Sequence, residues 1–165
     1  MKYIYLVRHA KSSWADYSIP DHDRPLNERG KRDAPFMAAK LLESGQDIHA
    51  VLSSTARRAR KTATAFRKAF ELEKNQMVLD RSLYHARPDQ IIKAIQALPD
   101  SWNSVAVFGH NPGFTDLANR FPEVYIDNVP TCGILGSRCD VSNWTDWSPE
   151  SAEQLFFYYP KIWLS

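Results

Sequence analysis

The sequence predicts an α/β protein with a single domain: a three-layer α/β/α sandwich whose sheet is mostly parallel, with an antiparallel edge late in the chain. Short apolar segments rich in strand-forming residues alternate with amphipathic, helix-length segments as far as Phe121. Beyond Phe121, β-prone segments follow one another with no helix-length segment between them. The length of 165 residues suffices for one core but not for two ordinary domains, so we expect one domain over residues 1–165.

The first strand is predicted at residues 3–7, a continuous apolar run typical of a strand buried on both faces. Residues 10–25 are polar and contain two prolines, which indicates an irregular loop. Asn27 is suited to cap a helix that runs to about Glu43. A strand, a loop and a helix therefore open the chain.

A second unit of the same kind follows. Residues 50–52 predict a short buried strand, and residues 56–70 carry alanine and phenylalanine at helical spacing. We expect the hydroxyl groups of Ser53, Ser54 and Thr55 to cap this helix.

The third unit is less regular. Residues 77–79 predict a small strand, and Pro88 opens a helix that Pro99 closes. The inner face of this helix carries Ile91, Ile92, Ile95 and Leu98.

The clearest further strand is predicted at residues 105–108, followed by a helix with Asn111 as its cap and Pro112 at its first position. Residues 131–140 and 154–159 are then β-prone, with turn residues between them. These two segments predict the antiparallel edge.

Composition excludes several classes of function. Lys and Arg number 21 against 19 Asp and Glu, so the chain has no charged stripe for nucleic acid or an anionic membrane. The apolar run at the N-terminus is too short for a signal peptide or a membrane span, and with only two cysteines there is no disulfide framework. We therefore expect a cytoplasmic protein that binds neither nucleic acid nor membrane.

Phosphate-binding side chains follow three of the predicted strands. Arg8 and His9 end the first strand, Arg58 lies in the turn into the second helix, and His110 follows residues 105–108. Because the carboxyl ends of parallel strands meet at one edge of the sheet, we expect these four side chains to converge.

The four side chains suit phosphoryl transfer. Guanidinium groups pair with phosphate oxygens and neutralise the charge that develops in the transition state, so Arg8 and Arg58 can clamp a phosphoryl group. A neutral imidazole can attack phosphorus when its other nitrogen is hydrogen-bonded, which makes His9 the candidate nucleophile. We expect His110, as an imidazolium, to stabilise a phosphoryl oxygen.

On these residues the chain resembles the histidine phosphatase superfamily, relatives of phosphoglycerate mutase. Arg8-His9-Ala10 matches the family's Arg-His-Gly or Arg-His-Ala signature. The stretch from Arg58 to Thr62 matches its Arg-Ala-x-x-Thr pattern, and Gly109-His110 matches its Gly-His. The resemblance implies a phosphohistidine intermediate on His9 that water hydrolyses.

Further segments resemble the short SixA-type branch, the phosphohistidine phosphatases. These segments are Lys11-Ser12-Ser13-Trp14, Asp23-Arg24-Pro25-Leu26-Asn27-Glu28-Arg29-Gly30, Leu83-Tyr84-His85-Ala86 and Pro130-Thr131-Cys132-Gly133. The resemblance implies a phosphorylated protein as the partner. Ser12 and Arg24 lie near the nucleophile and are candidate substrate contacts, although capping or solvation of the loop would explain them as well.

The wider family often uses a carboxylic acid as proton donor, and no motif here marks one. Asp80 is a weak candidate because it precedes the Leu83-Tyr84 segment. A phosphohistidine needs such an acid less than a phosphate ester does, since imidazole departs more readily than an alkoxide. We expect no metal ion and no organic cofactor, because the neighbouring arginines repel cations and no zinc-type ligand spacing is present.

Cysteine chemistry is a competing interpretation. Cys132 and Arg138 have the Cys-x5-Arg spacing of cysteine-dependent phosphatases, which place a helix directly after the loop. Here an alternating pattern continues through Cys139 and Val141, which favours a strand. His22, His49 and His85 show no partner in the sequence and are expected to be ordinary surface or packing histidines.

Two other functions remain open from the sequence. The same site would serve a phosphomonoesterase acting on a small phosphorylated molecule. It would also serve a non-catalytic module that binds phosphorylated partners.

Overall fold

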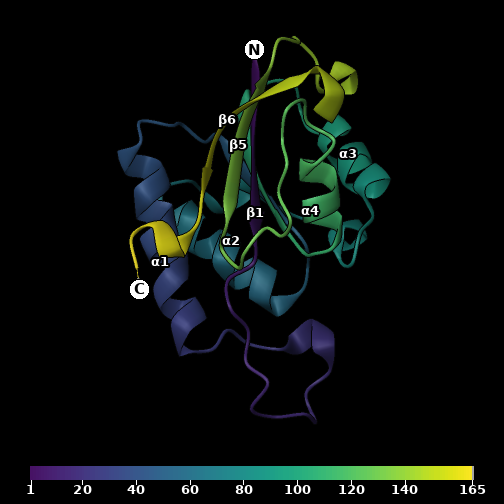
Figure 1. Ribbon diagram of the computed structural model, residues 1–165. Coiled ribbons are helices and arrows are strands. Elements are labelled where there is room, and N and C mark those ends of the chain that lie inside the picture. Colours follow the sequence, from purple (N-terminus) through teal and green to yellow (C-terminus); the bar gives the residue numbers. More distant parts are fainter. Residues whose placement is uncertain (165) are drawn as a thin grey trace.

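The computed structural model describes residues 1–164, and within them one six-stranded sheet has the strand order β3-β2-β4-β1-β5-β6 (Figure 1). The strands are β1 (Lys2–Arg8), β2 (Ala50–Ser53), β3 (Met77–Leu79), β4 (Ser104–Gly109), β5 (Ile134–Cys139) and β6 (Ala152–Tyr158). The α-helices are α1 (Glu28–Glu43), α2 (Arg57–Ala69), α3 (Pro88–Gln96) and α4 (Gly113–Ala118). Short 3-10 turns lie at Asp21–Asp23, Lys74–Gln76, Arg81–Leu83, Trp144–Asp146, Pro149–Ser151 and Pro160–Ile162.

Strands β1 to β4 are parallel, and their register aligns the ends of three of them. Arg8 at the end of β1 pairs with Gly109 at the end of β4, and Ser53 at the end of β2 pairs with Phe108. The carboxyl ends of these strands therefore stop at the same level. The loop between β1 and α1 extends below this edge, as Figure 1 shows.

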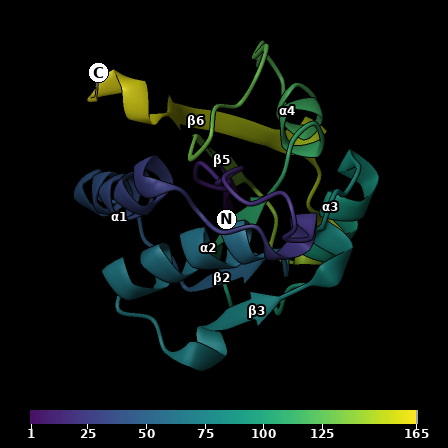
Figure 2. The ribbon, with the colours of Figure 1, turned by 90° about the horizontal axis from the view of Figure 1, so that it is seen from below.

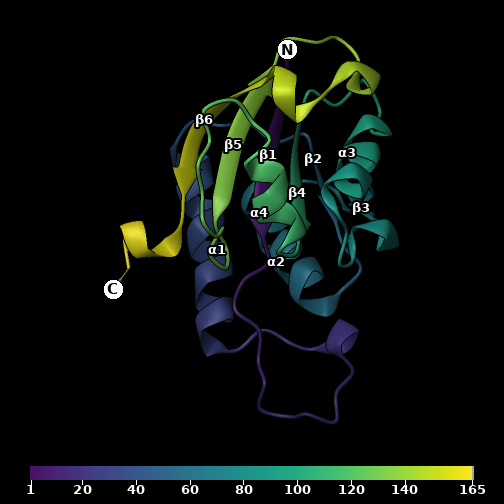
Figure 3. The ribbon, with the colours of Figure 1, turned by 45° about the vertical axis from the view of Figure 1, so that its right-hand side comes forward.

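The helices cover both faces of the sheet (Figure 2). Ala34, Met37 and Phe66 of α1 and α2 pack in one buried cluster with sheet residues such as Val7 and Val51. On the other face, α3 and α4 pack in a second cluster, and Figure 3 shows these two helices in front of the sheet. The α/β/α layering predicted from the sequence is confirmed.

The antiparallel edge is confirmed as well. β5 pairs antiparallel with β1, and β6 pairs antiparallel with β5. Only the 3-10 turns lie between these two strands in the described chain. On this side of the molecule, Trp144 and Trp147 are fully buried and pack against the α3 and α4 layer.

Two of the four helix starts agree with the sequence, those of α1 and of α3, which begins at the expected Pro88, and two differ. Asn27 caps α1 as expected, with its side chain accepting from the Gly30 amide at 2.9 Å. Helix α2 has no side-chain cap. The expected first position for Pro112 is also wrong by one residue, because α4 begins at Gly113.

Candidate active site

The predicted convergence of side chains is observed at the carboxyl edge of the sheet. Arg8, His9, Arg58 and His110 line one cavity of about 290 Å³, together with the loop residues Lys11, Ser12, Trp14, Asp21 and Arg24, and with His85, Asn111 and Thr131. The His9 amide donates to the Gly109 carbonyl at 3.1 Å, which ties the β1 and β4 turns together. Parallel register and this hydrogen bond bring the two histidines to a ring separation of 5.2 Å.

His9 is held in one orientation and is uncharged. Its Nδ1 lies 2.8 Å from the Ala10 carbonyl oxygen, and a carbonyl only accepts, so Nδ1 carries the proton and Nε2 carries the lone pair. Burial, opposed by that hydrogen bond and reinforced by the charges of Arg58 and Arg8, lowers the pKa of His9 to about 3. The lone pair on Nε2 is therefore available at neutral pH.

His110 is uncharged too, which differs from the expected imidazolium. Burial is the main cause, and His9 and Arg58 add to it, so that the pKa of His110 falls to about 2. Its Nε2 lies 2.8 Å from the Ser54 hydroxyl, which also accepts from the Ala56 amide at 3.2 Å. The hydroxyl of Ser54, expected to cap α2, thus contacts the second histidine instead.

Asp21 orders the arginines of the cavity. Its backbone carbonyl and its Oδ2 accept from Arg58 at 2.7 and 3.0 Å, and its Oδ1 accepts from Arg24 at 2.9 Å. Tyr84 and His85 also bond to Oδ2. Although burial acts to raise it, the hydrogen bonds from Tyr84 and Arg24 and the charge of Arg58 hold the pKa of Asp21 well below its usual range.

Buried donors around this cavity lack protein partners. The Nε groups of Arg8, Arg24 and Arg58 and the Nδ1 of His110 make no hydrogen bond within residues 1–164. Each buried donor left unpaired costs about 1–3 kcal/mol. Three guanidinium groups and an imidazole with unpaired nitrogens around one cavity therefore form a site that favours an anion with several acceptor oxygens.

Of the three further candidates from the sequence, Ser12 and Arg24 lie at the cavity and Asp80 does not. Ser12 and Arg24 both line the cavity, and Arg24 donates to the Ser12 hydroxyl while the Trp14 ring lies 3.6 Å from its guanidinium carbon. Asp80 does not line the cavity. Its carboxylate caps the turn Arg81–Leu83 by accepting from the Ser82 amide and hydroxyl at 2.9 and 2.7 Å.

Sequence reasoning missed Asp21, Ser54, Tyr84 and His85. Asp21 lies in an irregular loop and contacts residues more than sixty positions away, which no periodicity indicates. His85, expected to be an ordinary histidine, lines the cavity and has a positive φ of 53°. The only available signal was that Tyr84 and His85 lie in a segment shared with the SixA-type branch.

The cysteine interpretation finds no support in the geometry. Cys132 is fully buried in a turn before β5, and burial, with a smaller contribution from Asp33, raises the pKa of its thiol. Arg138 lies within β5 and pairs with Glu153 at 2.9 Å. The strand predicted after Cys132 is confirmed, and no helix follows the cysteine to lower its pKa.

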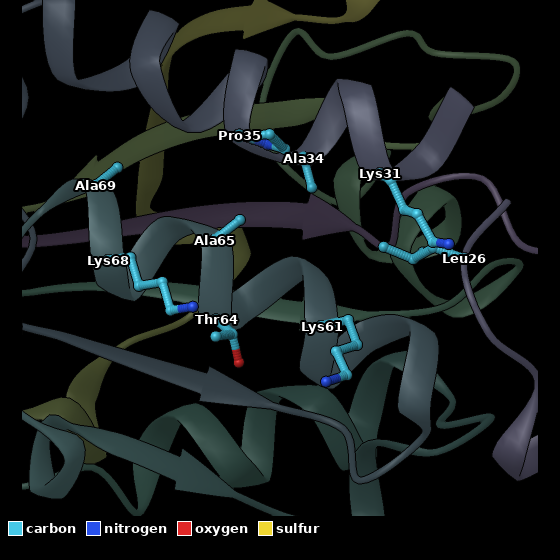
Figure 4. Close-up of a pocket in the computed structure, with 9 residues that line it drawn as sticks. All are labelled: Leu26, Lys31, Ala34, Pro35, Lys61, Thr64, Ala65, Lys68 and Ala69. Carbon is cyan, nitrogen blue, oxygen red and sulfur yellow. The ribbon is translucent and has the colours of Figure 1, made fainter. Parts of the chain in front are cut away.

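A larger groove of about 610 Å³ lies between α1 and α2, away from the histidines (Figure 4). It is lined by alanines, Leu26 and Pro35, with Lys31, Lys61 and Lys68 among the lining residues. Its lining residues include no histidine, cysteine, aspartate or glutamate, so the smaller cavity is the candidate active site. Within residues 1–164, no cluster of three or more His, Cys, Asp or Glu side chains is arranged to hold a metal ion.

Across the same residues, no helix is both long enough and apolar enough to cross a membrane.

Comparison with known proteins agrees with this geometry. A model of the histidine phosphatase superfamily (branch 1) matches residues 4–84, which include Arg8, His9 and Arg58. An uncharacterised protein of Mycobacterium tuberculosis is 33% identical over 165 residues, which cover 94% of this chain and 100% of that protein.

Solved structures show the same fold over nearly the whole chain. A protein of Agrobacterium tumefaciens assigned as the phosphohistidine phosphatase SixA is 28% identical, with a TM-score of 0.79 over 96% of this chain and 98% of that one. The protein histidine phosphatase SixA in complex with tungstate is 21% identical, with a TM-score of 0.80 over 97% and 98% of the two chains.

Proposed function

The chain belongs to the histidine phosphatase superfamily, and we propose that it transfers a phosphoryl group to His9 and then to water, without a metal ion. The observation that carries this proposal is the set of unpaired buried donors on Arg8, Arg58 and His110 around an uncharged His9. A phosphoryl group supplies the acceptor oxygens that these donors lack, and phosphorus meets the lone pair on His9 Nε2.

The first step forms a phosphohistidine. His9 Nε2 attacks phosphorus while its Nδ1–H stays bonded to the Ala10 carbonyl, and this hydrogen bond stabilises the positive charge that the ring acquires. Arg8 and Arg58 bind the equatorial oxygens, and Asp21 holds the Arg58 side chain in place for that contact. Water then attacks the phosphohistidine and releases inorganic phosphate.

His110 binds a phosphoryl oxygen through Nδ1. A neutral ring can do so only if Nδ1 carries the proton, which requires Nε2 to accept the Ser54 hydroxyl proton at 2.8 Å. Ser54 is then the group that selects this tautomer. In this account a neutral His110 donates a hydrogen bond, and no imidazolium is needed.

The proposed substrate is a phosphohistidine on another protein. The similarity to the Agrobacterium protein assigned as a phosphohistidine phosphatase supports this choice. The loop beside the cavity also exposes Trp14 (58%) and Tyr17 (87%), and aromatic side chains of this kind are enriched where proteins bind one another. A protein-borne phosphohistidine could reach the cavity while the surrounding surface contacts this loop.

The test is an assay in the presence of a metal chelator with a phosphohistidine peptide and with p-nitrophenyl phosphate. Wild-type protein and Cys132→Ser are expected to hydrolyse both, with the peptide preferred, and His9→Ala is expected to hydrolyse neither. Preference for small metabolites over the peptide would favour a phosphomonoesterase. Binding of the peptide without turnover by any of the three proteins would favour the interaction module.

A further inference from the structure

We propose that His85 is the proton donor and acceptor of this phosphatase: it protonates the leaving group in the first step and deprotonates water in the second. The inference rests on the proposed transfer to His9, because both proton transfers accompany bond changes at that phosphorus. It assigns a catalytic role that neither the signature residues nor the candidate Asp80 supplies.

The position of His85 suits this role. It lines the same cavity as His9, and its ring centre lies 5.4 Å from that of His110 and 4.1 Å from that of Tyr84, with the His85 and Tyr84 rings tilted by 36°. Its side chain is 55% exposed, unlike the deeply buried His9 and His110. A group at the mouth of the cavity can meet both a departing group and an entering water.

The backbone at His85 is held in an uncommon conformation. Its φ of 53° lies in the left-handed region, which is disfavoured for a residue with a side chain. The neighbouring Ala86 carbonyl packs so closely on Gly113 of α4 that a Cβ there would lie 2.1 Å from the oxygen. Such strain persists where surrounding structure fixes it, and it concentrates at functional sites.

Asp21 fixes the orientation of the ring. Its Oδ2 lies 3.2 Å from His85 Nε2, and the ionised carboxylate only accepts, so Nε2 carries a proton. The other nitrogen, Nδ1, bonds to no side chain or backbone group in residues 1–164. A carboxylate on one ring nitrogen with the other free is the arrangement in which imidazole exchanges protons with a substrate.

The other acids of the cavity are poorer donors. Asp21 is ionised, and its carboxylate accepts from Arg24, Arg58, Tyr84 and His85. The Tyr84 hydroxyl already donates to Asp21, and burial together with that bond raises its pKa. His110 is uncharged, with a pKa lowered to about 2 mainly by burial. Among the carboxylate, phenol and imidazole groups in or beside the cavity, His85 is therefore the one suited to both proton transfers.

The first step begins with His85 protonated on both ring nitrogens, Nε2–H facing the Asp21 carboxylate and Nδ1–H facing the leaving group. The His9 Nε2 lone pair forms a bond to phosphorus, the bond to the leaving oxygen or nitrogen breaks, and that atom takes the proton from His85 Nδ1, which leaves His85 neutral. In the second, water oxygen bonds to phosphorus, its proton passes to His85 Nδ1, and the electron pair of the broken N–P bond returns to His9. The protein ends in its starting state, and inorganic phosphate leaves.

The test uses His85→Asn, because asparagine tolerates the left-handed region and can bond to Asp21 but does not transfer a proton. For p-nitrophenyl phosphate, whose leaving group departs without a proton, kcat/KM is expected to change less than about threefold. For an alkyl phosphate ester, kcat/KM is expected to fall by about 10²–10⁴. Loss of the base should also slow hydrolysis, so p-nitrophenol is released in a burst while phosphoenzyme accumulates.

The matched control is His49→Asn, since His49 accepts from the Asn103 amide at 3.0 Å and does not line the cavity. This variant should retain wild-type rates on both substrates. Imidazole added to His85→Ala should restore part of the activity on the alkyl ester. Equal losses of kcat/KM on both substrates in His85→Asn, with no burst of p-nitrophenol, would overturn the proposed role of His85. If wild-type protein forms no phosphoenzyme at all, the proposed function fails instead.

Discussion

Two uncharged imidazoles, His9 and His110, lie buried beside guanidinium groups, and this combination has consequences for stability as well as chemistry. Each ring would gain a proton far more readily in the unfolded chain, where its pKa is near the ordinary histidine value of 6.5, than in the folded protein. The cavity is therefore arranged for anion binding at a cost in acid stability.

Stability should fall as the solution is acidified below pH 6.5. The folded pKa values of about 3 and about 2 mean that the unfolded state binds more protons, so acid favours unfolding. Below pH 6.5 each histidine lowers the free energy of unfolding by about 1.4 kcal/mol per pH unit. Only the lower half of the interval from pH 7.5 to 5.5 lies in that range, so the two histidines together should lower it by roughly 2–3 kcal/mol. Urea denaturation at the two pH values measures this drop.

A double variant, His9→Asn with His110→Asn, is the control for that experiment. It removes both titrating rings and should lose little stability over the same range. An unchanged stability in the wild type would contradict the uncharged state of the two rings.

Ser54 should position His110. Ser54→Ala removes the 2.8 Å contact to His110 Nε2, so the ring no longer has a fixed tautomer. We expect kcat to fall about tenfold or more and inorganic phosphate to bind more weakly, measured by steady-state kinetics and calorimetry. Ser53→Ala, which removes a buried hydroxyl bonded only to the Ser54 carbonyl, should keep both values near wild type.

The strands and helices contribute to the site mainly through the residues at their ends. Strands β1, β2 and β4 end in register, and each is followed by residues of the site. The loop before α1 adds Asp21 and Arg24, and Asp21 bonds to both Arg24 and Arg58. Helix α1 anchors this loop through Asn27. The Asn27 side chain accepts from the Gly30 amide, and the Asn27 backbone amide donates to the Lys11 carbonyl. The position of α1 therefore controls the geometry of the loop.

Gly30→Ala should disturb the contact between helix α1 and the loop that precedes it. A Cβ at Gly30 would lie 2.1 Å from the Lys11 carbonyl oxygen, so the helix and the loop must separate. We expect a loss of about 1–3 kcal/mol in the free energy of unfolding. The value of kcat/KM should fall as well, because Ser12 and Arg24 shift with the loop.

The neighbouring exposed variant Lys31→Ala provides the comparison. It should leave stability within about 0.5 kcal/mol of wild type. Wild-type kinetics and stability in Gly30→Ala would show that α1 does not fix the loop.

Over the whole molecule, the parts predicted from the sequence are those governed by periodicity and topology. Apolar runs indicated the parallel strands, the cap residue Asn27 indicated α1, and helical spacing indicated α2 and α3. Parallel topology predicted that His9, Arg58 and His110 would meet. Contacts made by the loop were not predictable, since Asp21 reaches Arg58, Tyr84 and His85 through tertiary packing alone. The start of α4 differed by one residue because both Asn111 and Pro112 suit a helix start.

The packing of the whole chain also determines the reactivity of its thiols. Cys132 and Cys139 are free and buried, and burial raises the pKa of both. Iodoacetamide should therefore label the native protein slowly and leave phosphatase activity intact, whereas urea-unfolded protein should take up two labels. Rapid inactivation when iodoacetamide labels the folded protein would support a cysteine nucleophile.

If the phosphoryl group passes through His9, a phosphoenzyme can be trapped during turnover. Protein mixed with ³²P-labelled phosphohistidine peptide is quenched within milliseconds, digested under alkaline conditions and mapped by mass spectrometry. We expect an acid-labile, alkali-stable phosphate on His9 in the wild type and in His85→Asn, and none in His9→Ala. Phosphate on Cys132, or turnover without any phosphate on His9, would contradict transfer through His9.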